Sequence, residues 1–191
     1  MPPPKQKYFF NKIKPIETVT FQMKTSLWIV FINLVNENLE LARNEKYLEI
    51  RRRRIISVVV FAAACIESFI NEYAQEHLSN EWESIDRLSL SDKWLVVIKL
   101  LNKKELSRKA ELFKDIVWLK NFRNYLIHYK ARFESLKKDQ STTNINQRLI
   151  IENAEKTFNI IKKSIKTFFE LTELDPPDAV YGWKIIEDKS K

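Results

Sequence analysis

A short segment in the second half of the chain combines side chains that are suited to phosphate chemistry. It covers residues 121–129 and reads N-F-R-N-Y-L-I-H-Y. Arg123 lies five residues before His128, and Asn124 directly follows the arginine. An arginine grips phosphate with paired N–H donors, and a histidine can transfer a proton near neutral pH. Because the chain has only two histidines, His128 has little competition for such a role.

These side chains fit a metal-independent cleavage of RNA. The reaction needs a base for the 2′-hydroxyl, a cation that stabilises charge on the phosphate, and an acid for the leaving oxygen. We expect His128 to act as base or acid, Arg123 to stabilise the phosphate, and Asn124 to orient the ring or the phosphate. Two copies related by a two-fold axis would double each group. The expected site therefore lies between two chains.

Helical spacing divides this segment into a core face and a polar stripe. We predict a helix over residues 110–133. At 100° per residue, its core face carries Ile116, Leu119, Phe122, Leu126, Tyr129 and Phe133. The far side carries a polar stripe of Asn121, Asn124, His128 and Arg132. Arg123 falls between the two, roughly 140° from His128, so His128 should face solvent or a partner.

The remainder of the chain also has helical patterning. We predict further helices over residues 20–44, 46–78, 92–101 and 148–174. The helix over 46–78 should be central, because its middle is apolar on nearly all sides. Ser91 is the expected N-cap of the helix over 92–101. We expect a connection with a short helix over 79–90 and an exposed loop over 136–147. The predicted fold is all-α, a four- to five-helix up-and-down bundle.

Composition excludes several classes of protein. Gly182 is the single glycine, which rules out glycine-rich phosphate loops and dinucleotide-binding fingerprints. The single cysteine, Cys65, sits in the apolar run V-V-V-F-A-A-A-C-I, where a buried thiol is expected rather than a nucleophile. One cysteine and two histidines argue against a zinc site. We expect no metal and no other cofactor.

Charge and hydropathy indicate where the chain acts. Its formal net charge of +8 favours a polyanionic partner, nucleic acid before membrane. We expect a basic mobile tail over residues 1–15, one helical domain over 16–175 and a second tail over 176–191. The start of the chain lacks the apolar core of a signal peptide, and the apolar runs are shorter than the about 20 residues of a membrane span. A cytoplasmic protein with no membrane partner is expected.

The pattern Arg-Asn-x-x-x-His in an all-helical chain resembles the motif of the HEPN superfamily. In that family four to six residues separate the arginine and the histidine, and a polar residue usually follows the arginine. Arg123, Asn124 and His128 match this pattern. The likeness extends to A-A-C-I-E-S-F-I-N-E at residues 63–72, which is similar to the family's acidic helix, and to L-S-L-S-D-K-W at residues 88–94.

The resemblance implies a HEPN-like fold and metal-independent endoribonuclease activity. HEPN enzymes often serve toxin–antitoxin, defence or RNA-processing systems, as homodimers with two motifs at a shared cleft. It also implies a protein partner such as an antitoxin. Many members are instead inactive modules that bind nucleic acid, nucleotide or protein, so this alternative stays open, as does a purely structural dimer.

Several further residues are expected to assist the motif. Glu67 could hold Arg123 in place, although any other basic partner is an equally good interpretation. Asn71 and Asn121 are further candidates for support. Three cations beside the motif are expected to bind RNA phosphates: Lys120, Lys130 and Arg132. The arginine run at residues 51–54 could do the same, although such runs are more often solvated helix ends.

Overall fold

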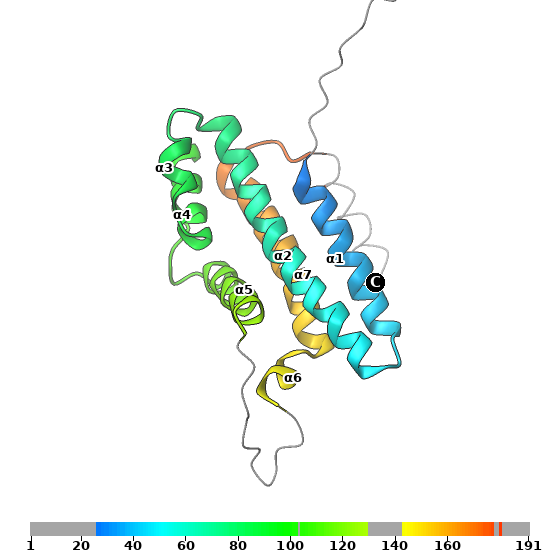
Figure 1. The fold of residues 1–191 in the computed structure, drawn as a ribbon. Coiled ribbons are helices and arrows are strands. Elements are labelled where there is room, and N and C mark those ends of the chain that lie inside the picture. Colours follow the sequence, from blue (N-terminus) through cyan, green and yellow to red (C-terminus); the bar gives the residue numbers. More distant parts are fainter. Residues whose placement is uncertain (1–25, 103, 130–142, 178–179, 181–191) are drawn as a thin grey trace, which may run out of the picture.

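The computed structural model describes residues 26–102, 104–129, 143–177 and 180. Within these ranges the chain forms seven helices and no strand (Figure 1). They are α1 (Leu27–Asn44), α2 (Leu48–His77), α3 (Trp82–Asp86), α4 (Leu90–Asn102), α5 (Glu111–Ile127), α6 (Asn144–Arg148) and α7 (Ile151–Thr172). The predicted all-α character is confirmed for this part of the chain.

Helix α2 is the central element, as its apolar middle predicted. It packs against α1, α3, α4, α5 and α7, and Figure 1 shows α1 and α7 beside it as long helices. Its buried side chains include Ile55, Ile66 and Phe69, each with no exposed surface. A helix that is apolar around most of its circumference gains most when other helices cover several of its sides.

Aromatic rings join α2 to three other helices. The Phe69 ring lies 5.4 Å from the ring of Trp28 in α1, 5.9 Å from Trp94 in α4 and 5.0 Å from Phe168 in α7, measured between ring centroids. All four side chains are almost fully buried. Edge-to-face and stacked pairs of this kind add to the stabilisation from burial. This cluster holds α1, α4 and α7 to the central helix.

The predicted N-cap of α4 was wrong by two residues. Ser91 lies inside the helix, whose first residue is Leu90. Ser89 Oγ accepts from the backbone N–H of Asp92 over 3.4 Å and donates to Asp92 Oδ2 over 2.7 Å. An N-cap bonds the backbone two or three residues ahead. Serine is a preferred N-cap residue at either position, but only Ser89 is followed three residues later by a carboxylate, that of Asp92.

The predicted loop over 136–147 was wrong at its end, where Asn144 begins the short helix α6. Ile145 packs against the core, and Leu149 between α6 and α7 is buried. A polar five-residue helix has little intrinsic stability and depends on such contacts. The last long helix starts at Ile151 rather than at the predicted residue 148, because α6 and its connection occupy the intervening positions.

Several predictions fall on residues that the structure does not describe. The tail over 1–15 and the predicted first turn at residues 20–25 are among them. The tail over 176–191 lies mostly there as well. Its described residue Val180 is buried and donates its backbone N–H to Pro177 O over 2.8 Å.

Length and composition would allow one described helix, α2, to cross a membrane. Half of its most apolar window is buried by the rest of the chain. The core helix of a soluble protein passes the same test, so this is weak evidence for a membrane span.

Candidate active site

Helix α5 carries the arginine–histidine segment and packs through the predicted core face. Three side chains of this predicted face are buried, Ile116, Leu119 and Phe122, and so is Leu112. The helix ends at Ile127, so the predicted helix over 110–133 was too long at its C-terminal end. The core face weakens there, since Leu126 is only half-buried and Ile127 is 53% exposed. A further turn would gain little from packing.

Arg123 lies between two acceptors. Its Nη2 donates to Glu67 Oε2 of α2 over 3.2 Å, and its Nη1 donates to Asn124 Oδ1 over 3.0 Å. The Arg123 side chain is 29% exposed and that of Glu67 is 37% exposed. A guanidinium has five N–H donors. These contacts fix its position, and the remaining donors make no bond to another described residue, so an anion can still be held.

His128 is the first residue after α5 and is exposed. Its backbone N–H donates to Asn124 O over 2.9 Å, which closes the last helical turn. Its imidazole has no hydrogen-bond or ion-pair partner within the described ranges. Five residues place it about 7.5 Å along the helix axis from Arg123. One chain therefore brings Arg123, Asn124 and Glu67 together, while His128 remains apart on the exposed side.

Of the two predicted supports on α2, only Glu67 contacts the motif. It is half-buried rather than enclosed in the core. Asn71 Oδ1 accepts from Lys93 Nζ of α4 over 2.8 Å. Lys93 is 3% exposed and also pairs with Asp86 over 3.1 Å. Asn71 thus satisfies a buried ammonium between α2 and α4, and makes no bond to Arg123.

Of the three predicted phosphate-binding cations, only Lys120 lies within the described residues. Lys120 Nζ donates to Ser91 Oγ of α4 over 3.2 Å and is half-buried. Lys130 and Arg132 lie outside the described residues. In the arginine run, Arg51 donates to Glu45 O, Arg52 pairs with Glu49, and Arg54 donates to Asn38 Oδ1. Most of that run therefore serves contacts near the start of α2.

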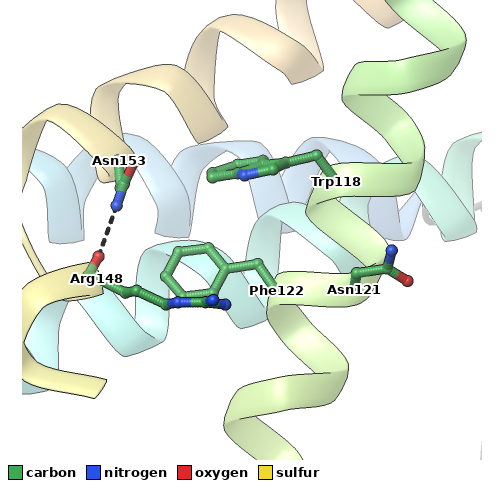
Figure 2. A pocket seen from close by; sticks show the side chains of 5 residues that line it. All are labelled: Trp118, Asn121, Phe122, Arg148 and Asn153. Carbon is green, nitrogen blue, oxygen red and sulfur yellow. Dashed lines mark hydrogen bonds between the residues drawn. The ribbon is translucent and has the colours of Figure 1, made fainter. Parts of the chain in front are cut away.

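A cavity between α5, α6 and α7 was not predicted. It has a volume of about 250 Å³ and is lined by Trp118, Asn121, Phe122, Arg148 and Asn153 (Figure 2). Asn121, a predicted support for the motif, thus lies at this cavity. No local pattern indicates the α6 and α7 side of this cavity, because α6 falls partly in the predicted loop. The aromatic residues preceding Arg123 were the available hint on α5.

A second, wider groove runs beside the Arg123–Glu67 pair. It has a volume of about 520 Å³. Leu27 and Phe31 of α1 line one side, and Ala64 and Glu67 of α2 line the other. Leu27 is 52% exposed. The carboxylate that holds Arg123 therefore borders a partly apolar surface.

Cys65 is buried, as predicted, and takes no part in this site. Its Sγ donates to Trp28 O over 3.3 Å. Burial raises the pKa of the Cys65 thiol from 9.0 to about 12, so the thiolate needed for nucleophilic attack does not form at neutral pH. Among the described residues, no group of three or more His, Cys, Asp or Glu side chains could hold a metal ion.

No protein-family profile, curated protein or solved structure matches this chain.

Proposed function

We propose that this chain is a HEPN-like, metal-independent endoribonuclease with a bundle fold, acting as a homodimer. The observation that carries the proposal is the position of Arg123. Glu67 and Asn124 hold its guanidinium at 3.2 and 3.0 Å, and the exposed His128 follows within two helical turns. A fixed cation and an exposed imidazole that no described residue binds, brought together by two copies of the chain, would supply what phosphodiester cleavage needs.

In the proposed reaction the 2′-hydroxyl oxygen attacks the adjacent phosphorus. One His128 removes the hydroxyl proton as the new P–O bond forms. Arg123 donates N–H groups to the non-bridging oxygens, on which negative charge increases. The P–O5′ bond breaks, and a protonated His128 of the second copy gives its proton to the leaving oxygen. The products are a 2′,3′-cyclic phosphate and a 5′-hydroxyl end.

Two features of the described residues support a second copy at the site. His128 and Arg123 of one chain differ by about 140° around α5, and each chain offers one histidine in this segment. The groove beside Glu67 and the exposed Leu27 and Val30 of α1, at 52% and 45%, supply an apolar surface for packing. We place the activity in the cytoplasm, under the control of a protein partner such as an antitoxin.

One observation favours a second candidate function, a non-catalytic module that binds RNA. Arg123 already pairs with the Glu67 carboxylate, which reduces the positive charge available to stabilise a phosphate during cleavage. In that case the polar side of α5 would bind RNA without cleaving it. The two functions differ in whether ordinary RNA is cut.

The test is incubation of the purified full chain with single-stranded RNA in EDTA, beside Arg123→Ala and His128→Ala. We expect cyclic phosphate ends with the wild type and loss of at least about a hundredfold in rate with either variant, the scale of a lost general acid or base. Activity per chain should fall on dilution below the dimer dissociation constant. RNA binding without cleavage would favour the module, and variants as active as the wild type would refute the site.

A further inference from the structure

The cavity between α5, α6 and α7 is built from flat and cationic side chains. Figure 2 shows the Trp118 indole and the Arg148 guanidinium edge-on, with the Phe122 ring drawn between them in this view. The Phe122 ring centroid lies 5.3 Å from that of Trp118. The volume of about 250 Å³ can hold one aromatic base, and stacking surfaces of this kind take any base because each has a π-face.

One cation lines this cavity, Arg148, whose Cζ lies 4.8 Å from the Tyr125 ring centroid. Arg148 pairs with no carboxylate among the described residues, in contrast to Arg43 elsewhere on the surface. The ring contact orients the guanidinium without neutralising it. Lys156 Nζ lies 4.3 Å from the Trp118 ring centroid, but Lys156 lines a separate pocket that contains four carboxylates. A ligand that joins an aromatic ring to a negative charge fits this combination.

Hydrogen-bonding groups complete the lining. Asn153 Nδ2 donates to Arg148 O over 2.8 Å, which fixes the junction of α6 and α7 and holds Arg148 at the cavity. Figure 2 shows the exposed Asn121 carboxamide at the border of the cavity, turned away from Trp118 and Arg148. The lining thus supplies a stacking surface and a positive charge together.

We propose that this cavity binds one unpaired base of a single-stranded RNA, with Trp118 and Arg148 stacking on the base. The proposal deepens the proposed function, on which its RNA ligand rests. Asn121 belongs both to the cavity and to the polar stripe of Asn124 and His128. A strand with one base in the cavity would therefore continue over the exposed side of α5.

The test uses a short single-stranded RNA with 2′-O-methyl groups throughout, which cannot undergo attack by a 2′-hydroxyl. It is titrated into the full chain while tryptophan fluorescence is followed. We expect quenching by the wild type, loss of most of the quenching in Trp118→Phe, and retained quenching in the matched control Trp82→Phe. Arg148→Gln should weaken binding about tenfold, within the range for loss of a stacked base.

A second arm separates base recognition from charge alone. An abasic ribose-phosphate oligomer of the same length should compete at least tenfold more weakly. Equal competition by the abasic oligomer, unchanged quenching in Trp118→Phe, or binding by Arg148→Gln within twofold of wild type would each overturn the proposal. Circular dichroism and thermal unfolding confirm that each variant is folded before titration.

The same titration with Arg123→Ala distinguishes failure of this proposal from failure of the enzyme. If that variant and the wild type both show quenching, while ordinary RNA is never cut, the base site stands and the nuclease falls. If ordinary RNA is cut in EDTA and no quenching occurs, the nuclease stands and the base site falls.

Discussion

Replacing Glu67 by glutamine isolates the charge that faces Arg123. The amide keeps the shape and an acceptor oxygen, so the guanidinium can still be bonded. The two side chains are 29% and 37% exposed, and exposed ion pairs contribute about 0.2–1 kcal/mol. We therefore expect Glu67→Gln to lower the free energy of unfolding by less than about 1 kcal/mol, measured by urea denaturation.

The effect on RNA binding should have the opposite sign. A phosphate on the remaining Arg123 donors would lie roughly 6 Å from the Glu67 carboxylate, where two negative charges repel by about 1 kcal/mol near a solvated surface. Removing that repulsion should tighten the binding of 2′-O-methyl RNA about fivefold at low salt, with a smaller gain at high salt. The cleavage rate should fall, because Arg123 is held less firmly.

A matched control comes from the Arg43–Glu155 pair. Its side chains are 41% and 42% exposed, and it joins α1 to α7. Glu155→Gln makes the same change in net charge and should leave RNA affinity within about twofold of wild type. The reasoning is refuted if Glu67→Gln weakens RNA binding as Arg123→Ala does, or if the two glutamine variants bind RNA equally.

Three further predictions concern the fold. Phe69→Ala should lower the free energy of unfolding in urea by about 3–5 kcal/mol, because it removes the central ring of the aromatic cluster and leaves a cavity. A decrease under about 1 kcal/mol would contradict the described packing. Asp86→Ala should destabilise the fold more than Lys93→Met does. Asp86→Ala leaves the buried Lys93 ammonium without its carboxylate partner, whereas Lys93→Met removes the buried charge itself. The reverse order in thermal unfolding would contradict this. Burial raises the pKa of the Cys65 thiol from 9.0 to about 12, so the folded state favours the neutral thiol. This contribution to stability is fully present below pH 9.0 and is lost as the pH rises toward about 12. The free energy of unfolding should therefore fall by about 1 kcal/mol between pH 8 and 10, and Cys65→Ala should remove that slope.

The positions of the long helices could be predicted from the sequence because their apolar residues repeat at helical spacing. The central place of α2 follows from the apolar run around Ile55 and Ile66, which have no exposed surface. The end of α5 could not be predicted in the same way. Tyr129 continues the spacing of the core face, yet it is only half-buried. Helical spacing shows on which face of a helix a residue lies, but it does not show how far the neighbouring helices extend to cover that face.

The candidate site shows the same limit. The contact between Arg123 and Glu67 was one of two equal interpretations, because a carboxylate on α2 can meet any nearby cation. Asn71 lies four residues after Glu67, on the same side of α2, but its oxygen accepts a hydrogen bond from the buried Lys93 instead. The cavity at Trp118 depends on α6, a helix whose formation requires tertiary contacts that no local pattern encodes.

The most direct test of the central claim is the rate at which 2′,3′-cyclic phosphate ends form on single-stranded RNA in EDTA. We expect product with the wild type, and with His128→Ala a rate at least about a hundredfold lower while the affinity for 2′-O-methyl RNA stays within about threefold. Equal rates for the wild type and His128→Ala would contradict it, and so would the absence of any product from RNA that the wild type binds.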